Sequence, residues 1–386
     1  MSGAIRVLHQ SPAVAGQFSA ELEALNWDAT TAQHQNATEA DVRRALAKPK
    51  RDINDFAALI SPAAKPFINE MVAESERLTL QRFGKTVSLF APLYLSNTCA
   101  NECTYCGFSM SNAIKRLTLD EAQIEREIAA IKQKGFDHIL LVTGETQKVS
   151  MPYFERMLPL FKPAFSQLSM EVQPLEMEEY AQLKELGLDG VLVYQETYRR
   201  STYLEHHLRG NKSDFNYRLD APDRIGQAKV HKIGLGVLLG LDDWRTDSIM
   251  MAHHLRHLQK RHWRSRFSVA FPRIRPCAGG IVPKSVISDL ELVQLIAAWR
   301  LFDADLEMSL STRESPEFRN HAARMGFTTM SAESKTQPGG YADDAKEALE
   351  QFEVSDERSV TEVANDIRAQ GREVVWKDWD ISLNLA

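Results

Sequence analysis

Short runs rich in β-branched and aromatic residues alternate with helical stretches from residue 86 onward, and this alternation limits the possible folds more than any other feature of the chain. Strands that alternate with helices imply βαβ units in a parallel sheet, and eight such units suggest a closed barrel. The sequence therefore predicts an α/β fold, a TIM-type (β/α)8 barrel. The expected strands are Thr86–Leu95, His138–Thr143, Leu168–Gln173, Gly190–Tyr194, Ile233–Gly240, Phe267–Phe271, Leu306–Leu310 and Phe327–Ser331.

Three parts are expected along the chain. Residues 1–85 show helical periodicity without strand alternation, which predicts an N-terminal helical extension that caps the barrel. Residues 86–340 carry the barrel, and residues 341–386 are expected to pack on it as a C-terminal tail. Thr118 begins a capping-box pattern and Gly135 is a stop signal, which together predict the limits of the first barrel helix.

The balance of charged residues excludes some classes of partner. Lys and Arg total 46 against 52 Asp and Glu, a formal net charge of −6, so we expect no binding to nucleic acid or to an anionic membrane. No apolar run reaches the roughly 18–20 residues that span a bilayer, and Met1–Asn36 lacks the pattern of a signal peptide. With only four cysteines, a secreted disulfide scaffold is disfavoured and a cytoplasmic protein is expected.

Three of the four cysteines follow the first expected strand as Cys99, Cys103 and Cys106, a C-x3-C-x2-C spacing. Thiolates are soft ligands that suit iron, and three of them on one loop can hold three corners of a cubane [4Fe–4S] cluster. The fourth iron is then open to a substrate or cofactor. The alternative is a zinc site completed by a remote group such as Cys277.

With Tyr105 before the last cysteine, this loop resembles the signature of the radical S-adenosylmethionine superfamily. In that superfamily the open iron is chelated by the amino and carboxylate groups of S-adenosylmethionine (SAM). The reduced cluster passes one electron to the sulfonium, and the 5′-deoxyadenosyl radical that forms removes a hydrogen atom from the substrate. The resemblance therefore implies two cofactors, a [4Fe–4S] cluster on the three cysteines and SAM.

Besides Tyr105, other positions match the superfamily pattern one by one, and the match implies that they contact SAM. Gly144–Glu145 resembles the turn that holds the methionine amino group, and Gln195–Glu196 resembles the polar pair that meets the ribose. Arg218 resembles an arginine that pairs with the methionine carboxylate. Gly236 resembles a glycine of the fifth strand, where a missing side chain lets adenine approach the backbone.

Longer stretches resemble one family of this superfamily, the 2-iminoacetate synthases, which are tyrosine lyases of thiamine biosynthesis. The resemblance runs from about residue 38 to 380 and implies cleavage of the Cα–Cβ bond of L-tyrosine. The implied products are p-cresol, from a 4-oxidobenzyl radical, and 2-iminoacetate (dehydroglycine), with SAM cleaved to 5′-deoxyadenosine and methionine. The stretches are Pro92–Asn97, Cys103–Asn112, Met170–Pro174, Val193–Tyr198, Leu310–Pro316, Ser334–Tyr341 and Val375–Asp380.

The family resemblance also implies partners for the reaction. A reduced flavodoxin or ferredoxin would supply the electrons. The 2-iminoacetate would pass, within a complex, to thiazole synthase, which builds the thiazole moiety of thiamine. The sequence itself marks no docking surface for either partner.

The substrate of such a reaction carries a carboxylate, which a guanidinium binds best in a bidentate manner. Arg313, after the seventh expected strand, is the candidate for this contact, with Ser331 and Ser334 as supporting donors. The alternative is that Arg313 pairs with the neighbouring Glu314 or Glu317. Radical intermediates also require that water be excluded, and we expect the N-terminal helices and the C-terminal tail to close the barrel mouth.

Two further features are interpreted as structural. Cys277 follows the sixth expected strand and is expected to lie in a turn. His253, His254 and His257 have a helical spacing that could bind a metal, but no glutamate base accompanies them. We therefore expect a solvated helix face at these histidines.

Two alternative functions stay open on the sequence alone, a tryptophan lyase and a non-catalytic carrier, and a third is disfavoured. A relative that cleaves tryptophan would share the same motifs. The tyrosine lyase that matures iron-only hydrogenase carries a second cluster on a C-terminal cysteine pair, whereas this chain has no cysteine after Cys277. A non-catalytic iron–sulfur or zinc carrier would not need Glu145, Gln195, Glu196 or Arg218.

Overall fold

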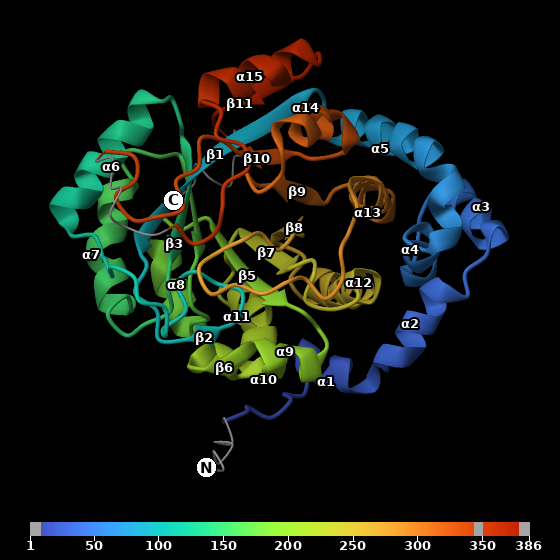
Figure 1. Ribbon diagram of the computed structural model, residues 1–386, viewed down its shortest axis with the longest axis horizontal. Helices are drawn as coiled ribbons and strands as arrows, with labels where there is room; N and C mark the ends of the chain where they lie inside the picture. The colour runs from blue at the N-terminus through green and yellow to red at the C-terminus, as the bar shows by residue number, and fades with distance from the viewer. Residues whose placement is uncertain (1–8, 343–349, 378–386) are drawn as a thin grey trace.

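The computed structural model describes residues 9–342 and 350–377, and its centre is a closed barrel of eight parallel strands (Figure 1). The first and last strands of the barrel pair with each other, beginning with Ser88 opposite Thr329, and this pairing closes the ring. The predicted TIM-type barrel is confirmed, and no strand end differs by more than three residues from its expected position. The strands are β1 (Thr86–Ser96), β3 (His138–Thr143), β4 (Gln167–Glu171), β5 (Gly190–Glu196), β7 (Lys232–Val237), β8 (Arg266–Ala270), β9 (Glu307–Leu310) and β10 (Thr329–Ser331).

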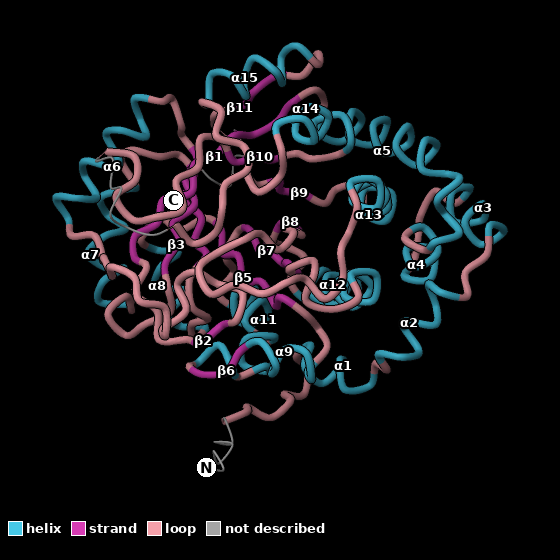
Figure 2. Tube along the Cα trace, viewed as in Figure 1, coloured by secondary structure: helices cyan, strands magenta, loops and turns pink. Residues whose placement is uncertain are grey.

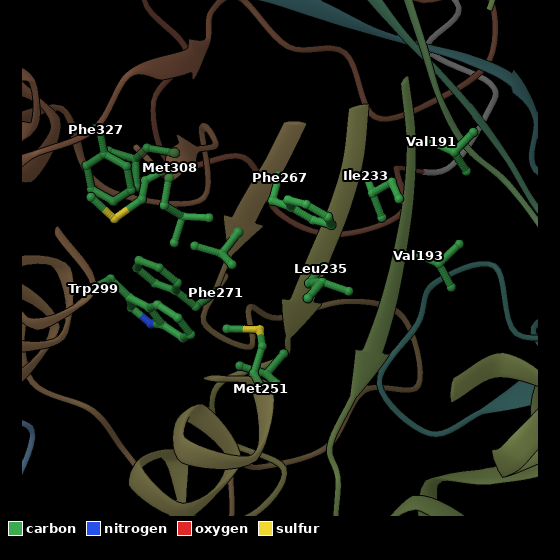
Figure 3. Close-up of a cluster of buried hydrophobic side chains, with 14 of the residues drawn as sticks. Val191, Val193, Ile233, Leu235, Met251, Phe267, Phe271, Trp299, Met308 and Phe327 are labelled. Atoms are coloured by element: carbon green, nitrogen blue, oxygen red, sulfur yellow. The ribbon is translucent and has the colours of Figure 1, made fainter. Parts of the chain in front are cut away.

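Helices cover the outer face of the barrel and bury an apolar core against it. They include α6 (Glu121–Gln133), α7 (Met151–Phe161), α8 (Met177–Glu185), α11 (Ala221–Gln227), α12 (Trp244–Arg261), α13 (Asp289–Phe302) and α14 (Pro316–Met325). Figure 3 shows the sector where Leu235 of β7 lies near Met251 of α12 and Trp299 of α13 is buried beside them. Trp299 is fully buried, so its truncation to alanine is expected to cost about 3–5 kcal/mol.

The N-terminal helices extend this outer layer on one side. They are α1 (Phe18–Ala24), α2 (Trp27–Gln35), α3 (Glu39–Ala47), α4 (Ile53–Leu59), the 3-10 turn η1 (Pro62–Phe67) and α5 (Ile68–Phe83). Helix α2 packs against α12, and α4 and α5 pack against α13 (Figure 1). The ring of Phe56 on α4 lies 4.6 Å from that of Trp299. No helix within residues 9–342 and 350–377 has both the length and the apolar character needed to cross a bilayer.

Several short elements complete the fold. The strands β2 (Glu102–Cys103) and β6 (His207–Arg209) form a small antiparallel pair that the sequence did not predict, because so few residues show no periodicity. Near the C-terminus, β11 (Glu373–Val375) pairs in parallel with the start of β1. The remaining elements are α9 (Arg200–His206), η2 (Asn211–Ser213), α10 (Phe215–Leu219) and α15 (Val360–Ala369).

The first barrel helix begins later than its sequence pattern predicts. Asp120 is the N-cap of α6, and its side chain accepts from the N–H of Gln123 in a reciprocal capping box. Thr118 instead bonds through its hydroxyl to that of Ser96, at 2.7 Å, and fixes the segment beside the end of β1. The predicted start at Thr118 is therefore wrong by two residues. The predicted stop holds, since Gly135 follows the helix with a φ of 89°.

The histidines of α12 are not a solvated face. His254 and His257 are buried, because α1 covers this side of α12, and the ring of Phe18 stacks on His254 at 4.1 Å. Burial lowers the pKa of His254 to about 3, so this ring is neutral. His257 lies between Glu21 of α1 and Asp223 of α11, at 2.8 and 3.1 Å. These histidines therefore attach the N-terminal helix to the barrel.

Candidate active site

A pocket opens at the carboxyl ends of the barrel strands, which is the end where enzymes of this fold hold their active sites. Its empty space, counted together with the open solvent at its mouth, is about 1590 Å³. Of the predicted site residues, Gln195 and Gly236 do not line it. Those that line it are Cys99, Cys103, Tyr105, Cys106, Gly144, Glu145, Glu196, Arg218, Arg313, Ser331 and Ser334.

The loop that carries the three cysteines is held in shape by contacts around it. Cys103 lies on β2, where pairing with β6 fixes the backbone, and its N–H donates to Ser109 Oγ at 2.8 Å. The guanidinium of Arg116 donates to four carbonyls of this region at 2.7–3.1 Å. Those carbonyls belong to Asn97, Phe108, Ser109 and Asn112. A single cation that the sequence analysis did not single out therefore clamps the loop.

The surroundings of the cysteines fit an iron–sulfur cluster better than a single ion. An apolar cluster of Phe90, Tyr94, Phe108, Leu140 and Val142 packs against Cys99 and Cys106. Within the described ranges, no three His, Cys, Asp or Glu side chains converge closely enough to hold one metal ion. A cubane spaces its thiolates farther apart than one zinc ion does. The three thiols on one pocket wall are thus compatible with a cluster that leaves one iron facing the pocket.

Beside the cysteine loop lies a set of paired charges. Glu145, two residues after β3, accepts from Arg218 Nη1 at 2.7 Å and from Asn101 Nδ2 at 2.8 Å. Lys212 Nζ donates to Glu196 Oε1 at 2.7 Å. Although burial opposes ionisation, Arg218 and Lys212 hold the pKa of Glu145 below its usual value. These two carboxylates and two cations form a polar wall that suits the amino and carboxylate groups of an amino-acid ligand.

The backbone at the end of β5 decides which side chain enters the pocket. The register between β5 and β7 shifts between Tyr194 and Glu196, and Glu196 adopts a φ of 70°, which is uncommon for a residue other than glycine. This bulge brings Glu196 to the pocket wall. Gln195 is buried off the wall, and neither of its amide atoms has a partner in the described part of the chain.

Gly236 supports the pocket indirectly. A Cβ at this position would lie 2.5 Å from the ring of Tyr194 on the neighbouring strand. Such a contact is far inside van der Waals distance, so only glycine leaves room for that ring. Tyr194 itself lines the pocket. Gly236 therefore acts here through an aromatic side chain of the pocket wall.

Arg313 lies across the pocket and is not neutralised by its neighbours. Glu314 is buried and accepts from Arg273 and Arg275, so it does not pair with Arg313. No ion pair joins Arg313 to any carboxylate, that of Glu317 included, among residues 9–342 and 350–377. The guanidinium instead lies over the ring of Phe352, 3.5 Å from the ring centroid. It is thus free to bind an anion.

Ser331 and Ser334 lie close to the segment that carries Arg313. The N–H of Thr312, next to Arg313, donates to Ser331 Oγ at 3.2 Å. The hydroxyl of Ser334 donates to the same Ser331 oxygen at 3.1 Å. Because both contacts use Ser331 as the acceptor, its own O–H remains available to donate to a ligand.

Glu171 faces Arg313 from the opposite side of the barrel. It ends β4, and three strands lie between β4 and β9 in either direction around the eight-stranded ring. Burial and the nearby Glu196 raise the pKa of Glu171 to about 7, so the carboxyl is poised near neutral pH. A long ligand held by Arg313 therefore has a carboxyl group at the far wall.

Loops and the C-terminal segment cover the pocket mouth. Figure 2 shows loops, rather than helices, crossing the centre of the barrel in this view. Thr336, Gln351 and Phe352 contribute to the pocket wall. The buried pair of Arg319 with Asp356, at 2.6 Å, anchors the segment to α14.

By contrast, none of the described residues before Phe90 lines the pocket. Our expectation that the N-terminal helices close the mouth is wrong, because their apolar faces pack on α12 and α13.

Tyr105 and Cys277 connect the cysteine loop to its surroundings. His207 Nδ1–H donates to the Tyr203 carbonyl at 2.6 Å, which leaves Nε2 to accept from the Tyr105 hydroxyl at 2.7 Å. The Cys277 thiol donates to the carbonyl of Tyr105 at 3.1 Å. Cys277 does not itself line the pocket, as expected for a structural residue.

Sequence reasoning missed several residues that the structure brings to this site: Tyr94, Asn101, Arg116, Glu171, Lys212 and Gln351. Asn101 and Glu171 lie within motifs already singled out, so their positions carried a signal. Lys212 and Gln351 are single polar residues in loops, where no periodicity distinguishes a pocket residue from a solvated one.

Known proteins resemble this chain in sequence and in fold. Residues 93–251 match the Radical SAM superfamily, and residues 270–373 match the Biotin and Thiamin Synthesis associated domain. The chain is similar to HydG, a maturase of the [FeFe]-hydrogenase, with 27% identity and a TM-score of 0.87 over 96% of this chain and 82% of that chain.

Two curated relatives are closer in sequence. The chain is 56% identical to 2-iminoacetate synthase of Escherichia coli (strain K12) over 371 residues, which cover 96% of this chain and 98% of that protein. It is 55% identical, over the same shares, to 2-iminoacetate synthase of Salmonella typhimurium (strain LT2). Such identity over almost the whole of both chains shows that the protein belongs to the 2-iminoacetate synthase family of radical SAM enzymes, which are carbon–carbon lyases.

Proposed function

We propose that this protein cleaves L-tyrosine at the Cα–Cβ bond to give 2-iminoacetate and p-cresol, while SAM is converted to 5′-deoxyadenosine and methionine. The observation that carries the proposal is that the three-cysteine loop, Cys99 to Cys106, and the unpaired Arg313 open into the same pocket. A cofactor at the loop and a free amino acid at Arg313 would therefore meet in one enclosed space. Membership of the 2-iminoacetate synthase family supports tyrosine as that amino acid.

The cofactor contacts follow from the charges beside the loop. Arg218 uses Nε and Nη1 on protein oxygens, which leaves Nη2 to bind the SAM carboxylate. Glu145 would accept from the SAM amino group, and Glu196 from the ribose hydroxyls. When bound on the three cysteines, the cluster supplies one electron to the SAM sulfonium, and the deoxyadenosyl group released there removes a hydrogen atom from the substrate.

The substrate would span the pocket between opposite walls. Arg313 would bind the tyrosine carboxylate with its two parallel N–H groups, and the free O–H of Ser331 would add a third donor. The ring of Phe352 beneath the guanidinium restricts the plane in which those N–H groups point. At the far wall, Glu171 would accept a hydrogen bond from the phenol hydroxyl. Tyr194 is one of the pocket residues available to pack against the substrate ring.

Glu171 and the apolar pocket wall would then act on the two products of Cα–Cβ cleavage. Once the substrate has lost a hydrogen atom, the Cα–Cβ bond breaks into 2-iminoacetate and a 4-oxidobenzyl radical, with the phenol proton held on Glu171. That radical becomes p-cresol when it takes up two protons, one of which Glu171 returns, and one electron, which the external one-electron donor would supply. The apolar wall of Phe90, Phe108 and Leu140 excludes water from the reacting atoms.

Two partners complete the proposal. A one-electron donor of the flavodoxin or ferredoxin type would reduce the bound cluster. An imine of glyoxylate is quickly hydrolysed in water, so 2-iminoacetate would be handed directly to thiazole synthase. We propose both partners on the basis of family membership and of this product chemistry.

Anaerobic reconstitution with iron and sulfide, followed by reduction and addition of SAM, tests the proposal. With tyrosine we expect p-cresol and 5′-deoxyadenosine in equal amounts, and with tryptophan we expect no indolic cleavage product. Cleavage of tryptophan alone would overturn the substrate assignment. A cluster-loaded protein that makes no 5′-deoxyadenosine with either amino acid would be a non-catalytic carrier.

A further inference from the structure

Gln351 lies in the C-terminal segment at the pocket mouth, and each of its polar groups has a partner. Its backbone N–H donates to the Thr336 carbonyl and its carbonyl accepts from the Gly107 N–H, both at 3.1 Å. Its side-chain Oε1 accepts from the Tyr94 hydroxyl at 2.8 Å. Its Nε2 donates to the sulfur of Cys106 at 3.7 Å. The residue therefore touches the cysteine loop through both its backbone and its amide.

The chemistry of the partners fixes the direction of this amide. A cysteine sulfur that ligates iron carries no proton and can only accept a hydrogen bond, so the amide nitrogen must face Cys106. The Tyr94 hydroxyl is then the donor to the amide oxygen. Tyr94 is buried, and its ring packs perpendicular to that of Phe108 at 5.8 Å. Turning the amide over would place its oxygen against the thiolate and so remove the bond to the sulfur.

The close approach of the two segments depends on Gly107, the residue after the third cysteine. A Cβ on Gly107 would lie 2.7 Å from the carbonyl oxygen of Gln351 and 2.9 Å from that of Glu350. Both distances are too short for real carbon–oxygen contacts. The absence of a side chain at Gly107 thus lets the C-terminal segment lie directly on the cluster loop.

We propose that Gln351 is a positioning residue for the cluster, and that its N–H···S bond to Cys106 raises the reduction potential of the cluster. The inference deepens the proposed function and rests on its cluster assignment. Hydrogen bonds to the sulfurs are one of the protein's means of tuning such potentials. A donor at the thiolate stabilises the reduced cluster more than the oxidised one, because reduction adds a negative charge.

The contact is specific to one corner of the site. In the described ranges, no side-chain N–H other than that of Gln351 donates to the sulfur of Cys99, Cys103 or Cys106. The donor also lies 245 residues away from Cys106 in the sequence. The placement of the C-terminal segment on the cysteine loop and the readiness of the cluster for reduction are therefore linked through one side chain.

Substitutions at Gln351 separate this role from a merely structural one. Gln351→Met keeps the length of the side chain but removes the amide, and Gln351→Glu replaces the donor by a carboxylate. Glu353→Gln is the matched control, because the exposed Glu353 contributes only a backbone N–H, to the Pro276 carbonyl. Each full-length variant is reconstituted anaerobically, its iron is counted, and the cluster is titrated potentiometrically without SAM while its EPR signal is recorded.

We expect about four irons per chain in every variant, a more negative midpoint potential for Gln351→Met, and a still more negative one for Gln351→Glu. Glu353→Gln should match the wild-type potential. A Gln351→Met protein with full iron and a wild-type potential would overturn the inference and leave the proposed function intact. Wild-type protein that binds no cluster would overturn both.

If Gln351→Met loses iron, Tyr94→Phe decides the question. This change removes the donor to Oε1 and lets the amide turn away from the sulfur. A negative shift in Tyr94→Phe supports the inference, and an unchanged potential at full iron content overturns it.

Discussion

The guanidinium of Arg218 donates to the carboxylate of Glu145 at 2.7 Å, and their side chains are only 6% and 12% exposed. Glu145 follows β3 whereas Arg218 belongs to α10, so the pair joins segments that are distant in the sequence. Because the second Glu145 oxygen accepts from Asn101, the cysteine loop is fixed to the same pair. The side chains of Glu145, Arg218 and Asn101 thus hold the cofactor wall together.

Glu145→Gln is expected to lower the free energy of unfolding by about 3 kcal/mol, because a buried Arg218 loses its counter-charge. The affinity for SAM should fall as well, since the acceptor for its amino group is weakened. Chemical denaturation and equilibrium dialysis measure the two effects. Glu74→Gln, in the exposed pair with Arg77, is the control and should change neither. An unaltered unfolding curve for Glu145→Gln would contradict this account of the pair.

Arg313→Lys should raise the KM for tyrosine about tenfold or more while the iron content stays at the wild-type level. Lysine keeps the charge but loses the planar fork that binds a carboxylate through two N–H groups, and tenfold corresponds to about 1.4 kcal/mol. Steady-state kinetics at saturating SAM measure the effect. Arg275→Lys, on a residue that pairs with Glu314, serves as the control. A KM unaffected by Arg313→Lys would place the substrate carboxylate elsewhere.

The pH dependence of kcat/KM should show an acidic limb that belongs to Glu171. Burial and Glu196 raise the pKa of this carboxyl to about 7, against the opposing effect of Arg313, Lys212 and Arg218. The ionised form accepts the phenol hydrogen, so kcat/KM is expected to rise as the pH passes through about 7. Glu171→Gln should remove this limb and lower the plateau. The same limb in the variant would show that another group titrates.

The melting temperature of Glu171→Gln distinguishes a catalytic role of Glu171 from an effect on folding. A carboxyl whose pKa is raised on folding binds its proton more tightly in the folded state, so its contribution to stability is lost as the pH rises toward 7. Above pH 7 the wild type carries a buried charge that Glu171→Gln lacks. The variant should therefore melt at the same temperature as the wild type or higher at about pH 8.

His257 should make attachment of the N-terminal helix dependent on pH. Both ring nitrogens face carboxylates, Glu21 and Asp223, and these raise the pKa of His257 although burial opposes them. The charged ring then stabilises the fold fully below its unfolded pKa of about 6.5, and this stability is lost as the pH rises through the folded pKa. Asp223, whose pKa is lowered, contributes unchanged above about pH 4.

Thermal unfolding of the wild type and of His257→Gln tests this prediction. The difference between their melting temperatures should shrink as the pH rises from about 6 to about 9. His321→Gln, at an exposed position of α14, is the control and should show no such trend. A difference that is constant across this range would mean that His257 is uncharged in the folded protein.

The barrel could be predicted because buried parallel strands read as short apolar runs between helical stretches. The site at the strand ends could be predicted for a related reason: Cys99, Glu145 and Arg313 each come just after such a run. What the sequence did not show depends on local geometry. The sequence does not indicate the bulge at the end of β5, where Glu196 has a positive φ. This bulge brings Glu196 to the pocket wall and leaves Gln195 buried away from it.

Other differences come from tertiary packing. His254 was expected in solvent because no glutamate base accompanies the three histidines, but α1 covers it from a distant part of the sequence. Gly236 was expected beside a ligand, yet the ring that needs its missing Cβ belongs to Tyr194 on the next strand. Gln351 gave no signal, since its importance lies in a contact across 245 residues.

A cluster held by Cys99, Cys103 and Cys106 would leave one iron without a protein thiolate, and this iron would bind SAM in the pocket that Glu145 and Arg218 also line. EPR spectroscopy of the reduced, reconstituted protein before and after addition of SAM tests it most directly. We predict that SAM changes the cluster spectrum in the wild type and in Cys277→Ala, and that Cys103→Ala loses the cluster. A wild-type spectrum identical with and without SAM, or a cluster held by four protein ligands, would contradict the account.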